Sequence, residues 1–586
     1  MSRFHATTRE THSAAIALSF SKPTHPYLDS FGAPLPFSLS VFKMAQNSKQ
    51  LEAKSLLYYL ARSKTCIGDG IFAGADLEGG EPVTTLKRPL IASLESERLK
   101  DTCANCFVWT EGSSLGSRLY VKEGTAVQAC AGCRRFRYCS RVHTRRLPMI
   151  SHTHNFQACQ KAAWNRGHKH ECKNLRPVGD KEIPKAVLGC MELLVRRKHK
   201  LIDDESWIML QALDSHIDDF MQNGKYPGIE LMAMGTSEFS ATQNTFSKEF
   251  VAAMYARILS NALTLITPTF DPLGILIDPL LCHANHSCEP NAYVVMDGAQ
   301  VQLRTLREVK KDEELYISYI DPTNPFARRQ SELQERWFFT CKCIKCQQTI
   351  NSDEDEWLIR PTAMPQNIKE MADMLLGKTD HEDEPANYVG DSAYERRAAA
   401  VQGEVFRLHE EAQRQADPAE AIETIESALR LCSQSLLWPV YRQPQPALRD
   451  NLIVNLLAAG KHELAWAHCA KRHRYITPKL YPQVYHPVRV VQTWQMAMLA
   501  QYLASTGTEV QPGVDMAVIA AVLIKAVTES AKTSHGVDSA FSRSVGEKYQ
   551  EVETEILAKF GSRDVMESAV KAQERKMKEM GDMAEF

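Results

Sequence analysis

The sequence has no long uninterrupted hydrophobic run and almost no net charge. Its longest apolar stretch, residues 514–527, is interrupted by Asp515 and Lys525 and is shorter than the roughly 20 residues that a membrane helix needs. Lys and Arg number 69 against 71 Asp and Glu, which leaves a formal net charge of −2 at pH 7. This balance gives no overall signal for nucleic acid or for an anionic membrane surface. We therefore expect no membrane partner.

Most of the chain also lacks a low-complexity composition. The hydrophobic fraction of 44% and the charged fraction of 24% are typical of globular protein, and 586 residues are enough for several domains. Residues 1–48 differ, because Ser, Thr, Pro and His are frequent there. We predict a disordered tail over 1–48. A secretory signal or transit peptide around the apolar patch 14–20 and a chain start at Met44 are the alternatives.

The placement of the 16 cysteines argues against a disulfide framework. Eleven of them have spacings typical of metal ligands, and zinc binds cysteine as the reduced thiolate. This predicts a nuclear or cytoplasmic protein. The other five are scattered, and we expect inert core thiols at Cys66, Cys190, Cys282, Cys432 and Cys469.

A segment of 70 residues, 103–172, carries ligands for two metal ions. It contains seven cysteines and one histidine in the pattern of zinc modules, namely Cys103, Cys106, Cys130, Cys133, Cys139, Cys159, His168 and Cys172. Eight ligands fill two tetrahedral zinc sites. A module of this size has little room for a hydrophobic core, so the metals are expected to supply its folding energy.

A second cluster of motifs lies between residues 285 and 346. Residues 285–291 read Asn-His-Ser-Cys-Glu-Pro-Asn, and the turn signal Asp297-Gly298 after them predicts a strand pair over 292–296 and 300–306. A Glu-Glu-Leu run at 313–315 precedes Tyr319, and Cys341, Cys343 and Cys346 follow. Three thiolates leave a tetrahedral zinc one ligand short.

These motifs, in this order, resemble the SET-and-MYND (SMYD) family of protein methyltransferases over residues 55–350. The resemblance implies an α+β multidomain fold, in which a β-rich SET domain is split by a zinc-binding MYND module and is followed by a post-SET zinc site and a C-terminal α-helical, TPR-like domain. The implied boundaries are 49–102 for the first SET piece, 103–172 for MYND, 173–265 for a helical region, 266–325 for the SET core, 326–350 for the post-SET segment, 351–395 for a linker and 396–586 for the helical domain.

The same resemblance assigns the ligands of three zinc ions per chain. The first set is Cys103, Cys106, Cys139 and Cys159, and the second is Cys130, Cys133, His168 and Cys172. For the third, the family supplies the missing ligand from the Asn-His-Ser-Cys run. The third set is therefore Cys288, Cys341, Cys343 and Cys346. A closed four-thiolate site is typical of structural zinc.

The resemblance further implies S-adenosyl-L-methionine as cofactor and a lysine side chain of a protein, histone or not, as substrate. The implied cofactor contacts are Gly70, Asn261, Asn285, His286, Tyr319 and Phe339. Tyr319 corresponds to the catalytic phenol at the point of methyl transfer, while Asn291 and Glu314 are expected to support the site. The sequence does not indicate which protein is methylated or how many methyl groups are added.

One departure from the family lies inside the first zinc set. The family has about three residues between the ligands that match Cys139 and Cys159, whereas this chain has nineteen. Removal of the 16 residues 142–157 restores the family spacing, so a retained short intron in the gene model is one hypothesis. A genuine surface loop is the other, because the closure cost of a loop grows slowly with its length.

Helices are expected in the region between the SET pieces and at the C-terminus. Residues 185–197, 207–220 and 246–265 have helical periodicity. From 396 onwards the pattern is helical nearly throughout, with Asp417-Pro418 as a helix start and Gly460 and Gly536 as helix ends. A generic helical bundle is the alternative to a TPR-like domain.

Two other classes of function remain open. A non-catalytic adaptor would bind partner peptides, because MYND modules of the family resemble binders of Pro-rich segments and helical repeats also bind partners. Nucleic-acid binding as an auxiliary role would use the arginines around the zinc module, Arg134, Arg135, Arg137, Arg141, Arg145 and Arg146. The intact Asn285 to Cys288 run and Tyr319 favour the enzyme.

Overall fold

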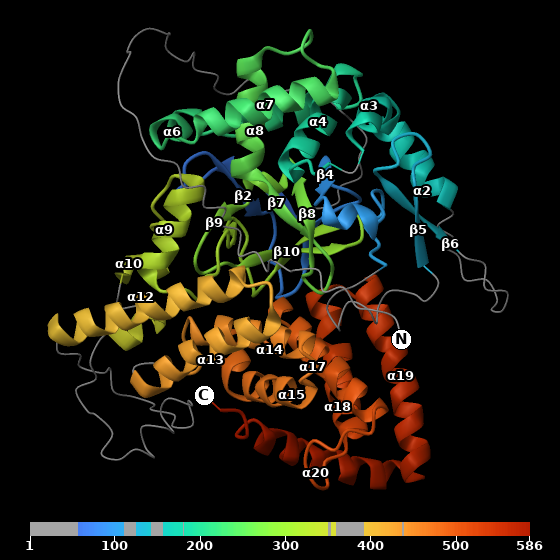
Figure 1. The fold of residues 1–586 in the computed structure, drawn as a ribbon, viewed down its shortest axis with the longest axis vertical. Coiled ribbons are helices and arrows are strands. Elements are labelled where there is room, and N and C mark those ends of the chain that lie inside the picture. Colours follow the sequence, from blue (N-terminus) through green and yellow to red (C-terminus); the bar gives the residue numbers. More distant parts are fainter. Residues whose placement is uncertain are drawn as a thin grey trace.

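The computed structural model describes residues 57–110, 125–141, 156–179, 181–349, 353–358, 392–435 and 439–585. Strands occupy the middle of the molecule, with one group of helices above them and the C-terminal helices below (Figure 1). This is the predicted mixed α+β fold with a large helical region at the C-terminus. The predicted tail 1–48 and residues 142–155 of the proposed insert lie outside the described residues. Among the described helices, none combines the length and the apolar character of a bilayer-spanning segment.

The central strands form three small sheets made from two distant parts of the chain. Strands from before residue 95 pair with strands from after residue 262 in every one of these sheets. The sheets are β1 (Tyr58–Arg62), β2 (Asp69–Ala73), β12 (Glu314–Ile317) and β9 (Asn285–His286); β10 (Ala292–Asp297), β11 (Gln300–Thr305) and β3 (Pro82–Leu86); and β4 (Ile91–Leu94), β8 (Pro272–Ile277) and β7 (Leu263–Ile266). The intervening segment is therefore an insertion into one β-rich unit, as predicted.

The predicted hairpin after the Asn-His-Ser-Cys run is confirmed. Strands β10 and β11 pair antiparallel from Ala292 opposite Thr305 to Asp297 opposite Gln300. Gly298 has a φ of 61°, which glycine adopts at no steric cost. The Asp-Gly signal thus fixed the position of the turn.

The inserted module is small and rich in cysteine. A two-stranded sheet of β5 (Thr125–Ala129) and β6 (Arg137–Arg141) contacts a helical segment made of α2 (Phe156–Ala163), η3 (Trp164–His168) and α3 (Lys169–Leu175). The last predicted metal ligand of the module, Cys172, lies on α3.

The helices above the sheets follow the expectation only in part. They are α4 (Lys185–Lys198), α5 (Asp204–Ala212), α6 (Ile217–Gln222), α7 (Tyr226–Ser240) and α8 (Lys248–Asn261). The helix predicted over 207–220 is wrong in its middle, because His216 has a positive φ and its N–H donates to Asp214 Oδ1. The third predicted helix ends at Asn261, and strand β7 follows it. Helix α7 was not predicted.

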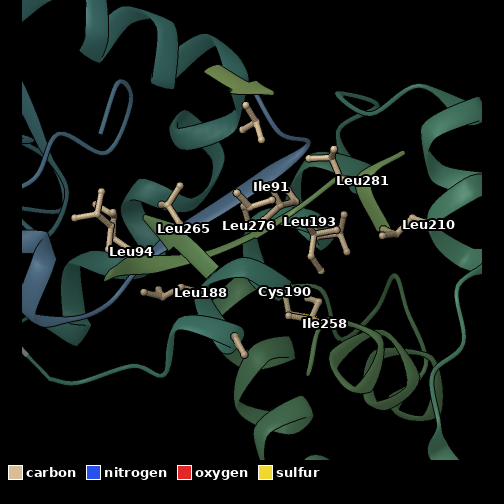
Figure 2. Packing of buried hydrophobic residues seen from close by; sticks show 14 of the residues in the cluster. Ile91, Leu94, Leu188, Cys190, Leu193, Leu210, Ile258, Leu265, Leu276 and Leu281 are labelled. Carbon is tan, nitrogen blue, oxygen red and sulfur yellow. The ribbon is translucent and has the colours of Figure 1, made fainter. Parts of the chain in front are cut away.

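The main core lies between these helices and the sheet β4-β8-β7. Leu188, Cys190 and Leu193 of α4 lie against the strands that carry Ile91 and Leu276 (Figure 2). These side chains are at most 5% exposed. Burial of apolar area of this kind is the dominant stabilising contribution to such a layer.

The C-terminal helices pack mostly one against the next in chain order, as helical repeats do. They are α12 (Ser392–Arg414), α13 (Pro418–Ser435), α14 (Gln445–Ala458), α15 (His462–Lys471), α17 (Pro487–Ser505), α18 (Met516–Ser534), α19 (Ala540–Phe560) and α20 (Arg563–Met580). The predicted start at Asp417-Pro418 is confirmed, since Asp417 Oδ1 accepts from the N–H of Ala419. Gly460 and Gly536 follow helix ends with positive φ, as predicted.

The helical region contacts the strand region directly. The hydroxyl of Tyr293 on β10 donates to the carbonyl oxygen of Ser534, and Arg304 Nη2 on β11 donates to the carbonyl of Thr533 at 3.1 Å. On another side, Arg328 of α9 (Phe326–Trp337) lies 3.3 Å from Glu410 of α12. The C-terminal helices therefore pack against both the strands and α9.

Candidate active site and metal centres

The candidate site is organised by a short parallel strand pair. Tyr316 pairs with Asn285 and Ile317 with His286, whereas the other strand pairs in the described residues are antiparallel. This pairing brings the Asn-His-Ser-Cys run beside the segment that leads to Tyr319. Two motifs about 30 residues apart in the sequence thus share one place.

Asn291 holds the two motifs together from inside. It is 1% exposed, and its amide donates to the carbonyl of Glu314 at 2.8 Å and to Glu313 Oε1 at 3.0 Å. Its side-chain oxygen accepts from the N–H of Tyr316 at 2.7 Å. The side chain therefore replaces backbone pairing at the start of β12, which is a supporting role.

Glu314 collects hydrogen bonds from three side chains of the site. Asn285 Nδ2 donates to its Oε1 at 2.8 Å, and the hydroxyls of Ser63 and Tyr316 each donate to its Oε2 at 2.8 Å. The carboxylate is 6% exposed, so these donors replace its water. The result is a fixed orientation for the Asn285 side chain.

Gly70 is required by this arrangement. A Cβ at position 70 would lie 2.2 Å from Glu314 Oε1 and 3.0 Å from Asn285 Nδ2. Any larger residue on β2 must displace the carboxylate that orients Asn285. Glycine here therefore serves close approach, not a special φ value.

Tyr319 lies just after β12 with its phenol turned inward. Its hydroxyl donates to the carbonyl oxygen of Ala284 at 2.8 Å, and its ring lies 5.2 Å from the rings of His286 and Trp337. Burial raises the pKa of the phenol above its ordinary value. The group is therefore a neutral phenol at neutral pH, and its oxygen keeps a lone pair for a second partner.

His286 is buried between Tyr319 and Cys288. Its Nδ1 accepts from the N–H of Tyr319 at 3.0 Å, so the ring proton of the neutral imidazole is on Nε2, which lies 3.3 Å from Cys288 Sγ. Burial lowers the pKa of the imidazole to about 4. Both ring nitrogens of His286 thus interact with groups of the protein. The backbone of His286 is the part that could contact a cofactor.

The two remaining predicted cofactor contacts are Asn261 and Phe339. Asn261 is the last residue of α8, its Nδ2 donates to the carbonyls of Asp214 and Arg257, and its own carbonyl accepts from Cys282. Phe339 is half-buried with its ring 6.0 Å from that of His286. The structure thus gathers His286, Tyr319 and Phe339 in one aromatic cluster and Gly70 with Asn285 in a second contact group.

The predicted metal ligands come together in three groups of four. We call Cys103, Cys106, Cys139 and Cys159 the first cluster, Cys130, Cys133, His168 and Cys172 the second, and Cys288, Cys341, Cys343 and Cys346 the third. Within each, all ligand atoms lie within 4.8 Å of one another. The 19 residues between Cys139 and Cys159 do not keep these two sulfurs apart, since they are 3.5 Å from each other.

The distances within the clusters fit a tetrahedral zinc ion. A Zn–S bond of about 2.3 Å places two tetrahedral thiolates about 3.8 Å apart. The sulfur pairs Cys106–Cys139, Cys130–Cys172 and Cys288–Cys346 are 3.6, 3.8 and 3.4 Å apart, far longer than the roughly 2.05 Å of a disulfide. His168 Nε2 lies 3.4 Å from Cys130 Sγ and 3.6 Å from Cys133 Sγ. The donor sets therefore suit zinc.

Several supporting residues could not be predicted from spacing. Glu171 Oε1 lies 3.0 Å from His168 Nδ1 and so directs Nε2 toward the second cluster, as carboxylates do for zinc-binding histidines. Asn105 Nδ2 donates to Cys159 Sγ at 3.4 Å. Arg329 lies beside the third cluster. Glu171 on α3 follows His168 at the end of η3 by three residues, and this spacing is the one weak sequence signal among the three supporting residues.

Comparison with known proteins agrees with this geometry. Residues 68–320 match the SET domain family model. The chain is 32% identical to SET domain and MYND-type zinc finger protein 6 of Schizosaccharomyces pombe over 297 residues, which is 50% of this chain and 53% of that protein. It is 27% identical to human Histone-lysine N-methyltransferase SMYD3 over 244 residues, 39% of this chain and 52% of that protein.

A third relative extends the similarity to the C-terminal part. The chain is 23% identical over 508 residues to Histone-lysine N-methyltransferase ASHR1 of Arabidopsis thaliana, 83% of this chain and 94% of that protein. For the fission yeast and human relatives, the match spans about half of their length. Along the chain, the SET strands, the zinc module, the third cluster and the C-terminal helices follow one another in the order that the sequence motifs predicted. Over about half of its length the chain is therefore similar to proteins of the SET-and-MYND (SMYD) family.

Proposed function

We propose that this protein transfers a methyl group from S-adenosyl-L-methionine to lysine side chains of proteins. The observation that carries the proposal is the parallel pairing of β9 with β12, which sets Asn285 and His286 beside Tyr319. Three relatives' names describe SET-and-MYND proteins or lysine methyltransferases, which supports the same reaction. S-adenosyl-L-methionine would supply the methyl group from its sulfonium centre.

The chain's own residues account for binding and orientation. Gly70 and Asn285 would offer backbone and amide contacts to the cofactor, with Glu314 holding the Asn285 amide in place. Phe339 would lie against the adenine and Asn261 near the methionine part. The half-buried Tyr319 would orient the lysine amine through its oxygen, since its hydroxyl proton is engaged by Ala284.

The substrate lysine must lose a proton before it can react. A free lysine has a pKa of about 10.4, so roughly one side chain in a few thousand is neutral at pH 7. A buried, partly apolar site raises that fraction because it disfavours the ammonium form. The site therefore does not require a strong base, and Tyr319 with its raised pKa does not provide one. Positioning of the two reactants supplies much of the acceleration.

We further propose zinc in all three clusters, three ions per chain. Four thiolates, or three thiolates and an imidazole, in a closed arrangement suit structural zinc, not a hydrolytic ion with an open position. Reduced thiolates agree with a nuclear or cytoplasmic protein. Pro-rich peptides remain candidate partners of the zinc module.

The test offers radiolabelled cofactor to the full chain with histones and with a cell lysate. The proposal predicts label on lysine of at least one protein and measurable cofactor binding by calorimetry. Binding of peptides by a chain that binds no cofactor would favour the adaptor function instead. Label on a residue type other than lysine would overturn the substrate class but keep the methyltransferase.

A further inference from the structure

A buried cation lies beside the third cluster. The side chain of Arg329, on α9, is 0% exposed. A guanidinium keeps its charge under all ordinary conditions, and a buried charge is costly unless anions compensate it. The role of Arg329 therefore depends on which negatively charged groups compensate its charge.

The oxygen atoms near Arg329 do not fully compensate the charge of its guanidinium group. Its Nη1 donates to the carbonyl oxygen of Asn324 and lies 3.6 Å from Glu354 Oε2 of η7 (Asp353–Leu358). The same carboxylate is 2.6 Å from Lys345 through its Oε1, so it is shared between two cations. Within the described residues Nε and Nη2 of Arg329 have no oxygen or nitrogen acceptor, and the guanidinium interacts with the sulfur of Cys346.

The sulfur atoms of the third cluster supply the missing negative charge. Burial alone would lower the pKa of Arg329, but the thiolates of Cys288 and Cys346, together with Glu354, outweigh it and raise the pKa. The geometry of α9 agrees, because Gln330, next to Arg329, donates to the carbonyl of Cys341 at 3.0 Å and accepts from its N–H at 2.9 Å, which fixes this part of the helix to the cluster. Zinc with four thiolates carries a net charge of −2, and that charge is buried here, since Cys288, Cys341 and Cys346 are at most 6% exposed.

We propose that Arg329 is the internal counter-cation of the third cluster, where it positions the cluster and stabilises its metal-loaded form. The proposal rests on the zinc site proposed above. Loaded cluster and Glu354 together carry −3 against +2 from Arg329 and Lys345, whereas without metal and with neutral thiols the same groups sum to +1. Metal binding and the packing of α9 against the cluster are therefore coupled. The metal-loaded cluster compensates the buried positive charge of Arg329, and Arg329 compensates the buried negative charge of the cluster.

The test measures zinc release from the full chain into a chromogenic chelator, together with total zinc by elemental analysis. Arg329→Met removes the charge and keeps a side chain of similar length. It should release one equivalent about 10–100-fold faster than the parent, as is typical when a group supporting a metal ligand is lost, while the other two equivalents leave at parental rates. Arg329→Lys keeps the charge and should fall between the two.

The matched control is Arg328→Met, one residue earlier on the same helix. Arg328 pairs instead with Glu332 at 2.8 Å and with Glu410 at 3.3 Å. It should release all three equivalents at parental rates. Equal release by Arg329→Met and Arg328→Met would overturn the proposal.

Glu354→Gln separates the proposed role from a purely structural pairing of Arg329 with Glu354, and it decides the question should Arg329→Met fail to fold. If Arg329 serves the thiolates, removal of the competing carboxylate leaves more positive charge for the cluster, and one equivalent should leave no faster than in the parent. Faster release by Glu354→Gln would mean that Arg329 serves Glu354, and would overturn the proposal. The zinc content of the parent protein tests the metal site itself. If it shows that the third cluster holds no zinc in the parent, the proposed metal site is refuted.

Discussion

His286 Nε2 lies 3.3 Å from the sulfur of Cys288, while Nδ1 of the same ring accepts from the backbone N–H of Tyr319. One imidazole thus connects a candidate metal ligand to the candidate catalytic residue. A hydrogen bond from Nε2–H to a thiolate is stronger than one to a thiol, because charge-assisted hydrogen bonds are stronger. Metal binding at the third cluster should therefore affect the position of Tyr319 through His286.

Cys288→Ser should reduce both zinc content and methyl transfer. The loss of one thiolate loosens the whole third cluster, and Phe339, two residues before Cys341, would move with it. We expect zinc to fall from about three to about two per chain, with cofactor affinity falling as well. Elemental analysis and calorimetry measure the two effects. Full zinc content with normal cofactor affinity would contradict the assignment of Cys288 as fourth ligand.

Chelation should unfold the inserted zinc module before the rest of the chain. Most of the module's buried residues are its own candidate ligand cysteines, with few apolar side chains beside them, so we expect metal affinity to supply most of its folding free energy. The apolar side chains are Phe107, Trp109, Tyr138, Ala163 and Leu175. Circular dichroism and limited proteolysis during titration with a chelator would follow this, with cleavage expected between residues 103 and 175. Resistance of that segment to protease after complete zinc removal would contradict the prediction.

Gly70→Ala should impair cofactor binding out of proportion to its size. The added methyl group would lie 2.2 Å from Glu314 Oε1, and the shift this forces costs about 1–3 kcal/mol of stability, as overpacking does. Because Glu314 orients Asn285, cofactor affinity should fall together with stability. Calorimetry and thermal unfolding measure the two.

Gly403→Ala is the matched control for this substitution. Gly403 lies within α12, and a Cβ there meets no atom within 4 Å. The change should stabilise the helix by about 0.5–1 kcal/mol and leave cofactor binding unaltered. Equal effects of the two substitutions would show that Gly70 is not at the site.

The C-terminal helical region should lose stability in mild acid. His468 is 7% exposed and its Nδ1 accepts from Arg449 Nη1 at 2.7 Å; burial, then Arg449 and Lys471, lower its pKa to about 3. The folded state keeps this ring neutral, whereas the unfolded chain binds a proton near pH 6.5. Stability due to His468 is therefore complete above pH 6.5 and falls by about 1.4 kcal/mol per pH unit below it, until the folded pKa is reached.

Urea unfolding of the parent and of His468→Gln at pH 7.5, 6 and 5 checks this prediction. Glutamine can accept from Arg449 but does not titrate, so its unfolding free energy should depend less on pH. Buried His535, whose pKa burial lowers to about 4, leaves a residual dependence in both proteins. Identical pH dependence of parent and variant would show that His468 is accessible to protons in the folded state.

The sequence predicted the features that local patterns determine. Cysteine spacing led to the three clusters, and Asp297-Gly298 led to the hairpin. Helix α7 was missed because Gly228 and Gly235 lower its helical propensity, and its packing against α4 and α8 compensates. Arg328 and Arg329 are adjacent and chemically identical, so only the tertiary structure distinguishes the partly exposed one from the buried one.

Tyr319→Phe should lower turnover far more than it weakens cofactor binding. The change removes the hydroxyl that donates to Ala284 and leaves the ring between His286 and Trp337, so packing is retained. A group that acts mainly in the transition state changes the rate constant and not the affinity. Loss of one such positioned group costs about 10²–10³ in rate. Asn285→Ala should show the opposite pattern, with cofactor affinity falling first.

Tyr293→Phe provides the matched control, because it removes a tyrosine hydroxyl that donates to Ser534 at the contact with α18. It should keep both turnover and cofactor affinity, so that any loss in Tyr319→Phe reports on position and not on the type of substitution. Calorimetry for the cofactor beside methylation of an accepted protein substrate measures both quantities for the three variants. Parental activity in Tyr319→Phe would remove the central residue from the lysine methyltransferase proposal, and the adaptor function would then account better for the three clusters and the helical domain.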